Sequence, residues 1–148
     1  MKITFQSIFN VAWQKFIVER QPPGSSGNGC SYRTPEGNRC AVGWALPESV
    51  FHHRDYQASL TFNALVDMIP DLFAAEIVGA TSDRLQSFQH SLHDSMVDER
   101  HEWHVSFEEM ESRYRMVAKK YHLTVPGPIG YNIGSPEEQL SIAMSPCL

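Results

Sequence analysis

Two stretches rich in proline and glycine divide this chain and limit where helices can form. The first, QPPGSSGNG, covers residues 21–29, and the second, TVPGPIGYNIGS, covers residues 124–135. Proline lacks the backbone N–H that a helix interior needs, and glycine loses the most conformational freedom on folding, so both stretches predict loops. The 148 residues suffice for one domain with a hydrophobic core but not for two of ordinary size.

Apolar residues recur at helical spacing on both sides of the first loop. Residues 3–20 predict one amphipathic helix, with Thr4 as its N-terminal cap. Residues 59–79 predict two short helices that separate near Pro70 and end at Gly79, because proline interrupts helices and glycine terminates them.

The later part of the chain predicts two longer helices and a short terminal one. An apolar stripe runs through residues 82–96, and Ser106 with Glu109 forms a capping box at the start of the next helix. Residues 1–125 are therefore expected to form a single globular domain. Residues 126–148 predict a loop and a short helix that docks on this body or on a partner subunit, and arm exchange of this kind would make a homo-oligomer.

The stretch CSYRTPEGNRCAVG, residues 30–43, departs from the helical pattern. Its centre has proline where a type I turn favours it, and Gly37 where the backbone needs a positive φ. We therefore predict a β-hairpin over about residues 30–42. The predicted fold class is α+β, a mainly α-helical small domain with this one hairpin.

The predicted hairpin carries groups that can recognise an anion. Arg33 would face Arg39 across it, and two like charges at this distance require a counter-anion or a carboxylate such as Glu36. Guanidinium groups donate paired hydrogen bonds to phosphate, and Tyr32 offers a ring for stacking. Tyr32, Arg33 and Arg39 are therefore the candidate ligand-binding residues for a small phosphorylated molecule such as a nucleotide.

Other interpretations of the same residues remain open. Lys15 or Arg20 of the first helix would join the two arginines if the helix packs beside the hairpin. Alternatively, Tyr32 belongs to the core, and the arginines are solvated or paired within the fold. A further alternative is that this surface, or the acidic stretch at residues 98–102, binds another protein.

Cys30 and Cys40 admit three interpretations. In the predicted hairpin their Cα atoms would be diagonal neighbours about 7–8 Å apart, which is slightly long for a disulfide. The favoured interpretation is a pair of packed thiols, with no cofactor, because free cysteines are commonly buried. The first alternative is a structural zinc site completed by His90 or His93, although nine residues between the cysteines is not a zinc-knuckle spacing.

The catalytic alternative is a cysteine-dependent enzyme. Cys40 would be its nucleophile, with His93 as the base and Asp94 as the group that orients the base. Such a pair needs a hydrogen-bond geometry that spacing does not provide, so we expect no catalysis.

The composition of the chain argues against some classes of binding partner and indicates a cellular compartment. The formal net charge of −5 argues against a broad nucleic-acid-binding surface. No apolar run approaches the roughly 18 residues of a membrane helix, so no membrane partner is expected. Three cysteines, an odd number, do not make a disulfide framework and favour a reducing cytosol.

These motifs resemble a family of small uncharacterised proteins of tailed bacteriophages and prophages. The family pattern C-x-Y-R-x-x-x-G-x-x-C-A-[VI]-G matches residues 30–43. It is preceded by IFN, as at residues 8–10, and followed by [IL]-P-[DE], as at residues 46–48. The resemblance covers roughly residues 3–125.

One later part of the family pattern, L-Q-x-x-H-D, is altered in this chain. It begins at Leu85 and Gln86, but His93 and Asp94 come later than the family spacing places them. His90 lies nearer the family position.

The resemblance implies a context rather than an activity, because the family has no established activity. It implies a phage protein that acts in the host cytoplasm on host machinery or host signals. Combined with the candidate anion site, it predicts a non-catalytic host-takeover or anti-defence protein. Such a protein would bind a small anionic ligand, for example by sequestering a nucleotide immune signal, or would bind a host protein.

Overall fold

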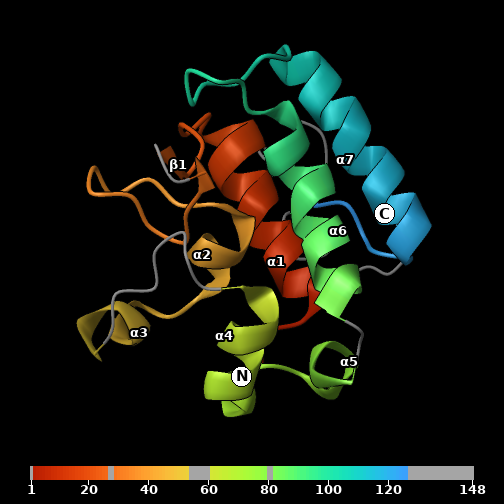
Figure 1. The fold of residues 1–148 in the computed structure, drawn as a ribbon. Coiled ribbons are helices and arrows are strands. Elements are labelled where there is room, and N and C mark those ends of the chain that lie inside the picture. Colours follow the sequence, from red (N-terminus) through yellow and green to blue (C-terminus); the bar gives the residue numbers. More distant parts are fainter. Residues whose placement is uncertain (1, 27–28, 54–60, 80–81, 127–148) are drawn as a thin grey trace, which may run out of the picture.

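The computed structural model describes residues 2–26, 29–53, 61–79 and 82–126, and this part of the chain is mainly α-helical (Figure 1). The helices are α1 (Phe5–Ala12), the π-helix η1 (Trp13–Val18), α2 (Ala41–Ala45), α3 (Glu48–His53), α4 (Phe62–Met68), the 3-10 helix η2 (Pro70–Leu72), α5 (Ala75–Val78), α6 (Ser82–Leu92), the 3-10 helix η3 (Asp94–Met96) and α7 (Phe107–Tyr121). Two strands of two residues each, β1 (Ser25–Ser26) and β2 (Gly29–Cys30), pair antiparallel.

The predicted β-hairpin over residues 30–42 is wrong, and with it the α+β fold class. The tight turn at its centre does form. Gly37 has a φ of 90°, and the Thr34 N–H donates to the Asn38 carbonyl oxygen over 2.7 Å. The residues that flank this turn do not continue as paired strands, so the turn connects a loop to a helix.

The reason lies in the residues after the turn. Cys40 is the N-cap of α2, and its Sγ accepts a hydrogen bond from the Gly43 N–H over 3.4 Å. Gly43 lies so close to the backbone of Tyr32 that an added Cβ would be 2.0 Å from the Tyr32 carbonyl oxygen. The segment therefore buries its small residues as a helix that packs against α1, which a strand in the predicted register would not do.

The predicted first helix forms, but it changes type partway. Thr4 caps α1 as expected: its hydroxyl accepts from the Ser7 N–H, and the Ser7 hydroxyl accepts from the Thr4 N–H. After Ala12 the chain continues as the π-helix η1 to Val18. Seven buried side chains place these two helices at the centre of the core: Phe5, Ile8, Phe9, Ala12, Trp13, Phe16 and Ile17.

The two longer predicted helices are confirmed as α6 with η3 and as α7. They run beside each other and beside α1 (Figure 1). The Ser106 hydroxyl accepts from the Glu109 N–H over 3.1 Å, as a cap at this position requires. The buried stripes are Leu85, Phe88, Leu92 and Met96 on the first helix, and Met110, Tyr114 and Val117 on the second.

The predicted pair of short helices around Pro70 is also confirmed. Helix α4 ends before Pro70, η2 begins at it, and Gly79 is the C-cap of α5. Backbone hydrogen bonds from the Ile3 N–H to the Leu72 carbonyl (2.7 Å) and from the Ala74 N–H to the Ile3 carbonyl (2.8 Å) attach this segment to the start of the chain.

The predicted terminal helix and its possible role in oligomer formation lie outside the described residues, as does most of the second Pro/Gly-rich stretch. Within the described ranges, no helix has both the length and the apolar character that crossing a membrane requires.

Candidate functional site

Arg33 and Arg39, on either side of the turn at Gly37, both pair with one carboxylate on α3. Arg33 Nη1 lies 3.3 Å from Glu48 Oε1, and Arg39 Nη2 donates to Glu48 Oε2. The counter-charge that the two arginines required is therefore Glu48. Glu36, which the sequence suggested for this role, is exposed in the turn.

Two aromatic rings pack against these guanidinium groups. The Arg33 Cζ lies 4.5 Å from the centroid of the Phe51 ring, and the Arg39 Cζ lies 4.6 Å from the same centroid. The Arg39 Cζ is also 5.0 Å from the ring centroid of Trp44 on α2. Such distances are typical of cation–π contacts. We call Arg33, Arg39, Trp44, Glu48 and Phe51 the arginine cluster.

Two cations of the first helix were candidates to lie beside the two arginines. Lys15 lies next to the arginine cluster, whereas Arg20 does not. The Lys15 Nζ lies 4.5 Å from the Trp44 ring centroid and 3.4 Å from Glu19 Oε1. The Arg20 guanidinium instead packs over Phe107, with its Cζ 4.6 Å from that ring centroid. Among the described residues, three cations thus gather around Trp44 and Phe51 and face two carboxylates, which gives this group an excess of positive charge.

The members of the arginine cluster differ in exposure. Arg39 is only 9 % exposed and Phe51 is buried, whereas the Glu48 side chain is 59 % exposed. In the described part of the structure, Arg39 Nε–H and Trp44 Nε1–H are buried donors without a hydrogen-bond acceptor. A buried donor left unpaired costs about 1–3 kcal/mol, so an acceptor at these two groups would stabilise the cluster.

Tyr32 is a core residue. It is buried, and its ring meets Phe62 edge-on with the centroids 5.7 Å apart. Burial, together with the nearby Cys40 and Asp94, raises the pKa of its hydroxyl far above the ordinary value. The ring beside the two arginines is therefore not Tyr32, as the sequence suggested, but Phe51 and Trp44.

A usable signal for the α3 members was present in the sequence. Pro47 indicates a helix start, and residues three apart on a helix share a face, so a helix that begins there places Glu48 and Phe51 on one side. No comparable signal pointed to Trp44, because its position depends on how α2 packs.

Cys40 is a buried thiol at the N-terminus of α2. Burial raises its pKa from the ordinary value of 9.0 to about 12, so at neutral pH it carries its proton. This agrees with the favoured interpretation of a packed thiol for Cys40. The side chain of Cys30 lies outside the description, so the packing of the two thiols against each other stays a prediction.

His93 and Asp94 belong to a buried hydrogen-bond network. His93 Nε2 accepts from the Gly24 N–H over 2.9 Å, so its Nδ1 carries the proton and donates to Asp94 Oδ1 over 2.8 Å. Asp94 Oδ1 also accepts from Gln89 Nε2 over 2.8 Å, and Gln89 Oε1 accepts from the Val42 N–H over 3.0 Å. Both ring nitrogens of His93 are engaged, so this network joins segments and does not present a base to a thiol.

Of the two histidines proposed for a zinc site, His93 is thus occupied, and His90 is exposed on α6. Across the described ranges, no three side chains of His, Cys, Asp or Glu are grouped as metal ligands.

The acidic stretch at residues 98–102 is organised by its own loop. Asp98 Oδ1 accepts from the Glu102 N–H over 3.1 Å and from the Arg100 N–H over 2.9 Å. These bonds lower the pKa of the Asp98 carboxyl, with Arg100 contributing its charge. The Asp98 carboxylate therefore stabilises the backbone of its own loop.

Comparisons with known proteins give no relatives. No protein-family model matches the chain, and no curated protein or solved structure matches it at a significant level. The function is therefore argued from the geometry of the site.

Proposed function

We propose that this protein binds a small phosphorylated molecule at the arginine cluster and is not an enzyme. The observation that carries the proposal is the pair of buried, unpaired donors, Arg39 Nε–H and Trp44 Nε1–H, within a cluster of excess positive charge. Phosphate oxygens accept several charge-assisted hydrogen bonds at once, which suits donors of this kind.

Glu48 is the internal competitor of such a ligand. Its carboxylate already accepts from both guanidinium groups, and more than half of its side chain is exposed. A phosphate group carries more charge and more acceptor oxygens than a carboxylate, so it can take over these bonds when Glu48 turns toward solvent. In this proposal the Glu48 carboxylate occupies the anion-binding position until the ligand displaces it.

The aromatic members favour a nucleotide over inorganic phosphate. Trp44 is half-buried, with cations near its ring, and its indole ring can contact a base while the guanidinium groups hold the phosphate. The protonated Cys40 and the engaged His93 supply neither a nucleophile nor a base, which supports binding without catalysis. The wider role, removal of a host nucleotide signal by a phage protein, rests on the sequence resemblance alone.

The test is isothermal titration calorimetry with inorganic phosphate, a mononucleotide and a cyclic dinucleotide. Arg33→Gln removes a partly exposed guanidinium without disturbing the core, and we expect the nucleotide Kd to rise about tenfold or more, as for the loss of one charge-assisted hydrogen bond. Glu48→Gln keeps an acceptor but removes the competing charge, so we expect it to lower the Kd.

Arg115→Gln is the matched control. Arg115 also pairs with a carboxylate, Glu111, at 3.1 Å, and also lies near an aromatic ring, with its Cζ 5.4 Å from the Trp13 centroid. The Arg115→Gln variant should leave the nucleotide Kd unchanged. Absence of nucleotide binding by the unmodified protein, or equal affinity of Arg33→Gln and Arg115→Gln, would overturn the proposal.

A further inference from the structure

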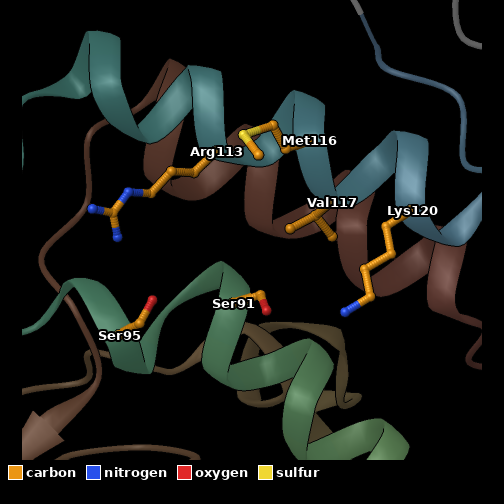
Figure 2. Close-up of a pocket in the computed structure, with 6 residues that line it drawn as sticks. All are labelled: Ser91, Ser95, Arg113, Met116, Val117 and Lys120. Carbon is orange, nitrogen blue, oxygen red and sulfur yellow. The ribbon is translucent and has the colours of Figure 1, made fainter.

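A pocket lies between α6–η3 and α7 (Figure 2), on the side of the molecule away from α3 (Figure 1). Its volume is about 370 Å³, within the range of small-molecule sites. The residues that line it are Ser91, Ser95, Arg113, Met116, Val117 and Lys120. None of them belongs to the arginine cluster, so this pocket is independent of the site described above.

The polar groups of the pocket converge from both helices. Figure 2 shows the Ser95 hydroxyl directed from η3 toward α7 and the Lys120 side chain extending from α7 toward α6, while the Ser91 hydroxyl on α6 points away from α7. Arg113 is held by an ion pair with Glu109 one turn earlier. Lys120 makes no ion pair with any residue in the described ranges, so its ammonium is the cation available to a ligand.

The rest of the pocket is apolar. Val117 is buried at the helix interface, whereas Met116 is 70 % exposed, more than any other large apolar side chain in the described part of the chain. Methionine is flexible and adapts its shape to an apolar partner. Covering Met116 with an apolar group would remove this surface from water.

An adjoining hollow of about 490 Å³ shares Ser91 and Lys120 with the pocket. It is more polar, and Asp83 and Asp94 line it. These carboxylates repel an anion on their side. An anionic group is therefore best placed at the junction, beside Lys120 and the Ser91 hydroxyl, with the rest of its molecule over Met116 and Val117.

We propose that this pocket binds a small amphipathic anion, a carboxylate or phosphate monoester on a compact apolar body. The ammonium of Lys120 and the hydroxyl of Ser91 hold the anionic head, and the apolar body covers Val117 and Met116.

Methyl NMR of protein labelled at the methionine methyl groups tests this proposal. The probes are octanoate and phenyl phosphate, which carry the two kinds of anionic head. We expect the Met116 methyl resonance to shift in a saturable way with at least one probe, and the comparison of the two shows which head the site prefers. Met68 on α4 is 39 % exposed and does not line the pocket, so its resonance serves as the internal control.

Variants separate the anion contact from unspecific apolar association. Lys120→Gln should raise the Kd of the better probe about tenfold, whereas Lys119→Gln, one residue away and outside the pocket, should not. Arg33→Gln should also leave this Kd unchanged, because it affects only the arginine cluster. No saturable shift of Met116 with either probe, or equal effects of Lys120→Gln and Lys119→Gln, would overturn the proposal.

Discussion

Cys40 illustrates how the surroundings of a single residue set its chemistry. Its Sγ caps α2 and is shut off from water, and burial raises its pKa from 9.0 to about 12. The folded protein therefore keeps this proton at a pH where the unfolded chain releases it. The resulting stability is fully present below about pH 9 and is lost as the pH rises from 9 toward 12, by about 1.4 kcal/mol per pH unit.

Replacement of Cys40 by serine tests this at the residue scale. Serine is a good N-cap and can accept from the Gly43 N–H, so Cys40→Ser should fold at pH 7. Urea unfolding between pH 8 and 11 should show a shallower loss of stability in the variant, because serine has no group that titrates in this range. The raised pKa of buried Tyr114 acts in both proteins, so the difference between them reports on Cys40 and on its effect on Tyr32. Unfolding of the variant at pH 7, matched by unfolding of the unmodified protein with a chelator, would instead indicate a structural zinc ion.

At the scale of elements, α2 depends on contact with a neighbouring segment more than on its own sequence. A glycine in a five-residue helix lowers its intrinsic stability, yet Gly43 is buried there. The compensation is the close approach to the backbone of Tyr32, which any Cβ would obstruct. The position of α2 in turn sets the position of Trp44 in the arginine cluster.

Gly43→Ala should therefore destabilise the protein, although alanine has a helix propensity that is more favourable than that of glycine by about 1 kcal/mol. A Cβ at 2.0 Å from the Tyr32 carbonyl oxygen forces the backbone to shift, and we expect a net loss of about 2 kcal/mol or more. The control is Gly79→Ala, where the nearest atom is 3.1 Å away. Urea unfolding compares the two, and a more stable Gly43→Ala protein would contradict the close approach.

Across the whole molecule, the buried network around His93 joins parts that are far apart in the sequence. It connects Gly24 in the first loop to η3, and Gln89 of α6 to the backbone of α2 at Val42. Helix α2 carries Trp44 and leads to α3. By holding α2 at Val42, the network therefore helps to position the residues of the arginine cluster.

Gln89→Met tests that support, because it removes the acceptor for the Val42 N–H and the donor to Asp94. Each buried group left unpaired costs about 1–3 kcal/mol, so we expect a loss of at least 2 kcal/mol in urea unfolding, and exposed Gln86→Met on the same helix should have little effect. Combined with His93→Phe, the loss should be smaller than the sum of the two single losses, because both residues belong to one network. Additive losses would show that the two residues act separately.

The sequence by itself determined the features that depend on residues within about four positions of each other. The caps at Thr4 and Ser106, the breaks at Pro70 and Gly79, the turn at Gly37 and the stripes of α6 and α7 all follow from local hydrogen bonds and helical periodicity. Local rules carry such features because the interacting groups are already neighbours along the chain.

Only the tertiary structure decided what each segment packs against. The segment after Cys40 could satisfy its backbone as a strand or as a helix, and contact with α1 and with the backbone of Tyr32 selected the helix. The same packing buried Tyr32 and brought Trp44 to the arginines in its place. Burial and electrostatic pairing depend on distances between residues that are remote in sequence, and these distances exist only after the helices have assembled.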